Sequence, residues 1–494
     1  MPFVDTPNSR CLLGIASCDI TPPVGIYHRM WGAATHERAA GVHRSLQASA
    51  VVFRRQSASG ADELVATAEI SQAEQVLISV DHCLLFAREM EELLGRIEAG
   101  SGVSCERLLV VFSHTHSAGL MSHDRQQLPG GDLIGDYLET LGTRLAEIVR
   151  QASAMVRPVT MVYGTGSCDL AANRDLRDEA TGGYVCGFNP DGSADDTVLV
   201  VRATDDAGQI IATFVNYACH PTTLAWQNQL ISPDYPGAMR EVVERATQAP
   251  CVFLQGASGD LGPREGFVGD PAVADRNGRQ LGYAALAVLE SMPPAGTRYE
   301  YVGQVVSGAT VGVWSHRPLP EAISDAQRRW QVARWNVALP YRPELPTTDK
   351  LRAARERFEI ALKNAEQSHD EAAARDARAM IERMDRQLSR LEVLPAGPDI
   401  PLPVWLWRMG DAIWMAVEAE HYQLLQRALR EKFIGVPIVV MTLANGSRPS
   451  YLPTSDKYNT GAYPETIAVL ARGSLERLIE QIAARITEWQ TVTN

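Results

Sequence analysis

The stretch LLVVFSHTHS, residues 108–117, joins a short apolar run to two histidines. Short runs of apolar, β-branched residues are typical of buried strands. Comparable runs occur at residues 51–53, 77–80, 198–201, 210–215 and 252–254. Helical stretches lie between them, and in residues 136–152 the apolar positions recur at helical spacing. This alternation of strands and helices predicts an α/β core.

The chain has 494 residues, more than a single hydrophobic core usually holds. Residues 320–395 are rich in Glu, Arg and Ala, with Leu, Met and Phe recurring on one helical face. We expect a core whose first part is residues 1–319, a helical insertion at 320–395 broken near Ser368, and the rest of the core at 396–494. The insertion is read as a structural buttress, with a lid or an oligomer contact as the alternative. Further strands are expected at 403–407, 412–417 and 436–443, and a final helix at 466–489.

The composition excludes several classes of function. A net charge of −13 and a pI near 5.4 argue against a nucleic-acid surface or a polybasic membrane patch. No apolar run approaches the ~20 residues of a membrane span, and the N-terminal residues do not resemble a secretory signal. The eight cysteines form no C-x-x-C motif, which favours buried free thiols. We therefore expect a cytoplasmic protein that acts on a small molecule, without a nucleic-acid partner or an integral membrane segment. Homo-oligomer formation stays open.

Histidines follow two of the predicted strands. In an extended chain, the side chains of His114 and His116 point the same way because they are two positions apart. His220 follows the strand at 210–215 and precedes Pro221, which cannot continue a central strand. Ligand sites gather at the carboxyl ends of strands in open α/β sheets, and imidazole is a common zinc ligand. These strand ends predict a metal site, and polar strand-end histidines without a metal are the alternative.

Two further regions are ambiguous from their residues alone. Glu420 follows the predicted strand 412–417 and precedes a predicted helix at 422–432. Its carboxylate could bind a metal, but the residues alone favour an electrostatic role at the helix N-terminus. Tyr451, Tyr458 and Tyr463 lie in a loop with proline and glycine, where packing and a surface hydrogen bond are the plain interpretation.

An ordered set of short motifs resembles the catalytic domain of neutral ceramidases, zinc amidases that cleave N-acylsphingosine. The matching stretches are GIASCDIT (14–21), SVD (79–81), SHTHS (113–117), ANR (172–174), NP (189–190), NYACHPTT (216–223), AE (419–420) with RALR (427–430), and YLPT (451–454) with Tyr458 and Tyr463. They run in order over almost the whole chain. Each motif is short, and their order makes the set fairly specific. The resemblance implies a mixed-sheet α/β core like that of the neutral ceramidase catalytic domain.

The resemblance also implies the site residues and the cofactor. It implies Zn²⁺ held by His114, His220, Glu420 and Tyr451. It implies catalytic, substrate-facing roles for His116, Arg174 and Tyr463. A zinc ion held by such N and O ligands would lower the pKa of a water molecule towards ~7.

The chain departs from the family at the motif G-D-V-S-P-N. It reads GDLGPR at residues 259–264, so Gly262 stands at the serine position and offers no hydroxyl. The chain also stops before the family's C-terminal immunoglobulin-like domain and carries the extra helical segment. Arg264 and Arg174 suggest a polar or anionic substrate, and structural ion pairing of either is the alternative. We assign Arg264 and Asp260 to substrate binding.

We therefore expect a zinc-dependent hydrolase that uses metal-activated water to cleave an amide (N-acyl) or related bond. A metal-dependent glycoside or ester hydrolase on the same scaffold is one alternative. A non-catalytic ceramidase-like binding protein is another, but binding alone rarely needs a full ligand set.

Overall fold

The computed structural model describes residues 2–56 and 74–491, and its centre is an eight-stranded mixed sheet of order β14-β12-β11-β7-β2-β4-β5-β6. The strands are β2 (Asn8–Asp19), β4 (Gln47–Arg54), β5 (Glu74–Val80), β6 (Leu108–Phe112), β7 (Arg157–Ser167), β11 (Thr197–Thr204), β12 (Ile210–Tyr217) and β14 (Cys251–Gln255). The pairs β5–β6 and β12–β14 are parallel, and the other neighbours are antiparallel. The predicted α/β class with a mixed sheet is confirmed.

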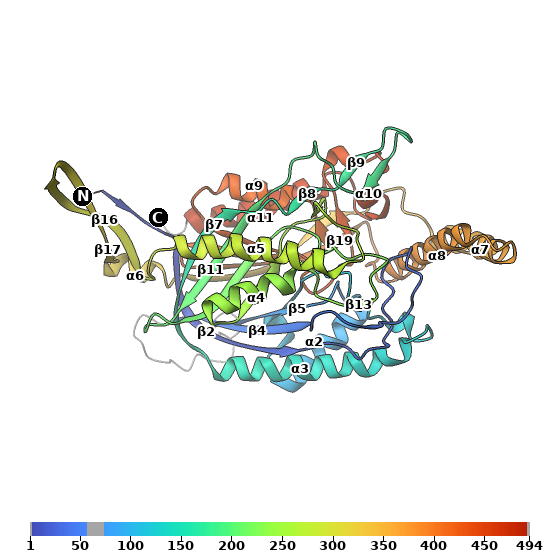
Figure 1. Ribbon diagram of the computed structural model, residues 1–494, viewed down its shortest axis with the longest axis horizontal. Helices are drawn as coiled ribbons and strands as arrows, with labels where there is room; N and C mark the ends of the chain where they lie inside the picture. Colours follow the sequence, from blue (N-terminus) through green and yellow to red (C-terminus); the bar gives the residue numbers. More distant parts are fainter. Residues whose placement is uncertain (1, 57–73, 492–494) are drawn as a thin grey trace.

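Helices cover one face of this sheet (Figure 1). They are α2 (Ala87–Ser101), α3 (Ile134–Ala154), α4 (Tyr235–Thr247) and α5 (Pro271–Ser291). Successive residues of a strand point to opposite faces, so Ala50 of β4 packs on α2 and α3 while Val51 points the other way. Val200 of β11 packs on α4 and α5 over the other half of the same face.

A second, four-stranded sheet covers the opposite face. Its order is β18 (Trp330–Pro340), β19 (Asp399–Met409), β20 (Ala412–Val417) and β22 (Ile438–Met441). Phe53 of β4 packs between the sheets against Trp407 and Trp414, with ring centroids 6.3 and 5.4 Å away. Helices α9 (Leu424–Lys432) and α11 (Ser474–Thr491) close the outer side of the small sheet. The core therefore has four layers, ordered helix, sheet, sheet, helix.

The predicted helical segment is shorter than residues 320–395. Only α6 (Glu321–Ala326), α7 (Thr348–Gln367) and α8 (Glu371–Glu392) are helical there, and Ser368, where the break is predicted, caps the end of α7. The expectation of helix at 330–340 is wrong, because β18 pairs along its whole length with β19 and belongs to the core. The final helix begins at Ser474, not near 466. A short helix α10 (Tyr463–Ile467) precedes it. Gly473, between the two helices, has a φ of +90°, which is incompatible with a continuous right-handed helix.

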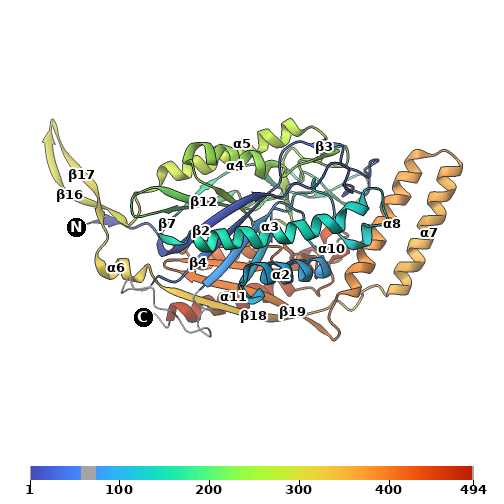
Figure 2. The same ribbon diagram turned by 90° about the horizontal axis from the view of Figure 1, so that it is seen from below.

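Two projections leave the core at opposite ends of the molecule (Figures 1 and 2). One is the α7–α8 hairpin, and the other is the hairpin of β16 (Thr297–Ser307) and β17 (Ala309–Pro318). All eight cysteines are unpaired. In the part of the chain that the structure describes, no helix is both long and apolar enough to span a bilayer.

The twist of the large sheet explains why distant strand ends meet. In a flat sheet of this pairing, the carboxyl ends of β6 and β12 would lie at opposite ends, because the strands run in opposite directions. Neighbouring strands are rotated by roughly 20–25°, so the six steps from β6 to β12 accumulate well over 100°. The sheet also curls until its edges approach, and Ser79 of β5 donates a hydrogen bond to the carbonyl of Phe253 in β14, 2.9 Å away.

Candidate metal centre

Four predicted ligands come together where the two sheets meet. His114 follows β6 and His220 follows β12, whereas Glu420 lies in β21 (Glu420–His421) and Tyr451 in β23 (Tyr451–Leu452). Strands β21 and β23 pair in parallel with Glu420 opposite Tyr451. The carboxylate therefore lies in a strand four residues before α9, and the helix-end role that the residues alone favoured is wrong.

The side chains of three of these residues converge on one point. The Oε2 atom of Glu420 lies 3.1 Å from Nε2 of His114 and 3.0 Å from Nε2 of His220. The hydroxyl of Tyr451 lies 3.1 Å from the same Nε2 of His220. All four residues are buried.

The other nitrogen of each histidine is held by a backbone carbonyl. Nδ1 of His114 donates to the carbonyl of Cys83 at 2.8 Å, and Nδ1 of His220 donates to the carbonyl of Ser258 at 2.7 Å. A neutral histidine that donates from Nδ1 presents the lone pair of Nε2, so both lone pairs point at Glu420. Three acceptors that meet in this way require a cation or an extra proton between them.

The charges of the centre agree with this requirement. Burial alone would lower the pKa of His114, but Cys83 and Glu420 outweigh it and raise that pKa well above its ordinary value. Burial alone would raise the pKa of Glu420, but His114 and His220 hold it well below its usual range. Burial and the Arg174 cation lower the pKa of His220 to about 3. His114 therefore carries the balancing proton when no cation lies between these groups.

A zinc ion fits this donor set. Two imidazole nitrogens and a carboxylate oxygen are preferred zinc ligands, and zinc binding requires the deprotonated ligand atoms that converge here. The phenol oxygen of Tyr451 is within reach as a fourth donor. Cys83 and His116 extend the group, because the ligand atoms of Cys83, His114 and His116 also lie within 4.8 Å of one another.

Strained backbone surrounds the ligands. His114 has a φ of +68°, Ala419 before Glu420 has +88°, and Ser450 before Tyr451 has +63°. Residues with a Cβ rarely adopt this region, and each such residue costs about 1–3 kcal/mol. The surrounding structure therefore holds these three ligand positions against local preference, as is common at functional sites.

The histidine pair does not follow the predicted strand geometry. The strand ends at Phe112, so His114 and His116 are not side by side on an extended chain. The left-handed residue His114 turns the chain, and the rings still meet with centroids 4.9 Å apart. His116 Nε2 lies 3.4 Å from His114 Nε2, and burial together with the charge of His114 holds the pKa of His116 well below its ordinary value.

Tyr463 and Arg174 lie on different sides of Tyr451. The ring of Tyr463 meets that of Tyr451 edge to face at 5.9 Å, and the residue is 43% exposed. Arg174 is buried and donates from Nη2 to the hydroxyl of Tyr451 at 3.0 Å and to the carbonyl of Gly259 at 2.8 Å. Arg174 thus contacts Tyr451 directly, whereas the exposed Tyr463 and the half-buried His116 are more accessible to solvent than the ligands.

Asp260 and Arg264, predicted to bind substrate, do not join the cluster. The carboxylate of Asp260 is buried and accepts hydrogen bonds from the backbone and the side chain of Gln423, both at 2.7 Å. Burial raises the pKa of Asp260 to about 6. The exposed Arg264 makes a 3.8 Å ion pair with Asp169, which agrees with the structural alternative considered for it.

The structure adds residues that the sequence reasoning missed. Trp31 packs against His116 with ring centroids 5.2 Å apart, and Trp226 and Phe267 pack against Trp31 at 6.1 and 5.7 Å. These rings form an aromatic cluster that contacts His116. Cys83 was also missed, and its only signal is its position two residues after the SVD stretch.

No family model matches the chain. It is 26% identical to a neutral ceramidase of Pseudomonas aeruginosa over 261 residues, which are 51% of this chain and 36% of the relative. It is 25% identical to neutral ceramidase B of Dictyostelium discoideum over 302 residues, or 55% of this chain and 39% of the relative. A neutral ceramidase of Oryza sativa subsp. japonica is 23% identical over 245 residues, which are 48% of this chain and 29% of the relative. The matched regions thus span between 29% and 39% of these relatives.

Solved structures extend the likeness over nearly the whole fold. The crystal structure of the Pseudomonas aeruginosa neutral ceramidase superposes with a TM-score of 0.59 and 18% identity, over 97% of this chain and 74% of that one. A ceramidase complexed with C2 gives a TM-score of 0.60 and 17% identity over the same shares of the two chains. The sequence is thus similar to neutral ceramidases over about half of the chain, and the fold is similar to theirs over nearly all of it.

Proposed function

We propose that the chain is a zinc-dependent hydrolase that cleaves an amide (N-acyl) bond of a polar small molecule with activated water. The observation that carries this proposal is the convergence of His114, His220 and Glu420 through acceptor atoms 3.0–3.1 Å apart. The similarity to neutral ceramidases supports an amide as the bond. Zinc bound there would supply Lewis acidity, which acidifies water and polarises a carbonyl.

The proposed roles of the residues differ with their exposure to solvent. The buried ligands hold the metal, and Arg174 orients Tyr451 among them. His116 is half-buried and Tyr463 is exposed, so a substrate carbonyl would lie beside these two side chains. His116 stays neutral because of its lowered pKa, so it can donate one N–H to an oxygen that gains charge, and the phenol of Tyr463 can donate a second bond.

The absence of a serine at position 262 favours water as the nucleophile. A Cβ placed on Gly262 would lie 3.7 Å from Cδ of Arg174 and from Oγ1 of Thr222, so the site has ordinary room for a side chain. Ser258 is a poor replacement for that serine, because its hydroxyl is buried and accepts a hydrogen bond from Gln255 at 2.6 Å. The nearby Nδ1 of His220, 3.2 Å from that hydroxyl, already donates to the Ser258 carbonyl and is no free base. The buried hydroxyl of Thr222 has no hydrogen-bond partner among the described residues and is the competing nucleophile.

The test is a substrate screen on one preparation in three states. N-acyl, ester and glycoside compounds are offered to zinc-loaded protein, to chelated protein and to protein reloaded with zinc. We expect chelation to remove N-acyl turnover and zinc to restore it. The turnover of the Thr222→Val variant should lie within a few-fold of that of the parent. N-acyl turnover that survives chelation, or turnover of esters or glycosides only, would contradict the proposal.

A further inference from the structure

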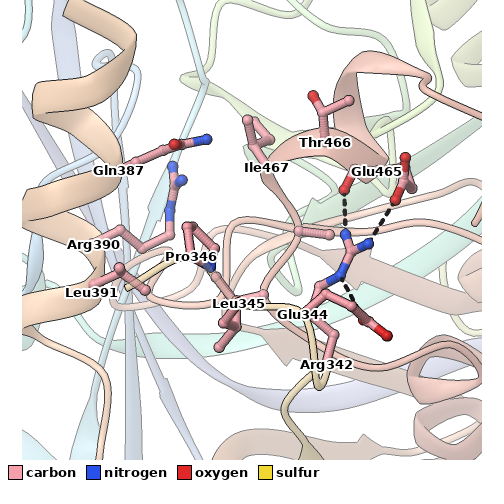
Figure 3. A pocket seen from close by; sticks show the side chains of 12 residues that line it. Arg342, Glu344, Leu345, Pro346, Gln387, Arg390, Leu391, Glu465, Thr466 and Ile467 are labelled. Atoms are coloured by element: carbon pink, nitrogen blue, oxygen red, sulfur yellow. Dashed lines mark hydrogen bonds and ion pairs between the residues drawn. The ribbon is translucent and has the colours of Figure 1, made fainter. Parts of the chain in front are cut away.

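A cavity of about 220 Å³ lies between the α7–α8 hairpin and the end of α10 (Figure 3). Gln387 and Arg390 of α8 line one side, and Thr466 of α10 lines the opposite side. In Figure 3 the guanidinium of Arg390 and the amide of Gln387 lie side by side in the space between the hairpin and Ile467. The cavity thus joins the extra helical segment to the core.

Arg390 is the unpaired charge of this cavity. Both carboxylates that line it, Glu465 and Glu344, pair with Arg342, at 2.9 and 3.8 Å. Within the described residues, the guanidinium of Arg390 has no hydrogen bond and no ion pair, although the structure leaves it only partly exposed. A partly desolvated charge without a partner is costly, so a ligand that supplies the counter-charge is the natural explanation.

The other arginines of α8 are engaged. Arg378 pairs with Glu37, Arg383 donates to the hydroxyl of Thr466 at 3.0 Å, and Arg386 donates to the carbonyl of Met30. Arg375 pairs with its neighbour Asp376 at 3.9 Å. The contacts of Arg378, Arg383 and Arg386 fix the hairpin on the core, and Arg390 takes no part in them.

The cavity adjoins the candidate metal centre. Tyr463 begins α10, whose next residues line the cavity, and its ring packs on that of the predicted ligand Tyr451. Burial lowers the pKa of Arg390, and the opposing electrostatic influence comes from Tyr463, Glu420 and Tyr451. Arg390 is therefore in electrostatic reach of three groups of the centre.

We propose that Arg390 binds a carboxylate of the substrate while the bond to be cleaved lies at the metal centre. The inference rests on the proposed function and narrows its substrate class to acyl amides that carry a negative charge. A guanidinium binds a carboxylate through two parallel hydrogen bonds, and the amide of Gln387 can add a third. The α7–α8 hairpin then contributes to substrate selection as well as to structure.

The test measures binding, so it does not depend on turnover. Dicarboxylic acid monohydroxamates of increasing length, each with its uncharged methyl-ended counterpart, are titrated calorimetrically into zinc-loaded protein. The hydroxamate anchors each compound at the metal, and the distal carboxylate probes Arg390. We expect at least one acid to bind about tenfold or more tightly than its counterpart, as a charge-assisted hydrogen bond predicts.

The variants separate this inference from the proposed function. Arg390→Gln should remove the preference, Arg390→Lys should keep part of it, and the matched control Arg375→Gln on the same helix should keep all of it. Unchanged melting temperatures show that the variants fold. An equal preference in Arg390→Gln and the parent, or none in the parent, overturns the inference and leaves the metal centre intact. If no hydroxamate of either kind binds zinc-loaded protein, the metal centre itself fails and the inference fails with it.

Discussion

Replacement of Arg174 by Gln should weaken zinc binding although Arg174 is not a predicted ligand. Arg174 donates a 3.0 Å hydrogen bond to the hydroxyl of Tyr451, and its guanidinium carbon lies 5.6 Å from the centroid of that ring. Burial and Glu420 raise the pKa of Tyr451, and Arg174 opposes them. A metal binds the deprotonated phenol oxygen, and the positive charge of Arg174 favours that form. Without Arg174, deprotonation of Tyr451 becomes harder and zinc binding weaker.

Loss of a group that holds a metal ligand typically costs 10–100-fold in metal affinity. This corresponds to about 1.4–2.8 kcal/mol of binding free energy. The affinity is measured by competition with a chelator of known zinc affinity at pH 7 and pH 9. The loss of zinc affinity relative to the parent should be smaller at pH 9 than at pH 7, because the higher pH makes deprotonation of Tyr451 easier in the variant.

Two controls belong to this experiment. Arg177→Gln removes the same charge from an exposed position three residues away and should leave zinc affinity unchanged. Tyr451→Phe should lose affinity at both pH values, because it lacks the hydroxyl. If Tyr451→Phe weakens zinc binding but Arg174→Gln does not, the proposed action of Arg174 through Tyr451 is wrong.

Three further outcomes are expected. His116→Ala and Tyr463→Phe should each lower kcat by about 10²–10³, with zinc content unchanged, because each removes a donor to the developing oxyanion; a loss of only a few-fold in Tyr463→Phe would withdraw its role. Serine-directed covalent inhibitors should leave turnover intact, and stoichiometric labelling of Ser258 with loss of activity would contradict a water nucleophile. Since the pKa of Asp260 is raised to about 6, its contribution to stability is present below about pH 4 and is lost as the pH rises through 6. Asp260→Asn should therefore gain stability relative to the parent by up to about 3 kcal/mol between pH 4 and pH 8 in urea unfolding, and a pH-independent difference would refute this assignment.

The sequence predicts the strands well because their signal is local. Apolar runs such as 108–112 and 210–215 lie in β6 and β12 as expected. The strand β18 was missed because the helical pattern of α7 and α8 was extended backwards over it. Its partner β19 lies about 60 residues further along the chain, and such pairing leaves no local mark.

The candidate site was only partly predictable for the same reason. Its residues could be named from motifs, but their meeting depends on the accumulated twist of the sheet and on left-handed backbone at His114, Ala419 and Ser450. None of these three residues is a glycine, so the sequence gives no warning of a positive φ there. The role proposed for Arg390 could not be predicted from the sequence either. Arg390 is one of several arginines in α8, and only the fold shows that its guanidinium has no partner among the described residues.

The metal content of purified protein tests the central claim most directly. Parent, His114→Ala and His220→Ala proteins are loaded with zinc, dialysed and analysed by inductively coupled plasma mass spectrometry. The parent should retain about one zinc per chain, as a single site with two histidine ligands predicts. Both variants should retain almost none, although their circular dichroism matches that of the parent. Full zinc retention in both variants, or no zinc in the parent, would contradict the metal centre on which the proposed function depends.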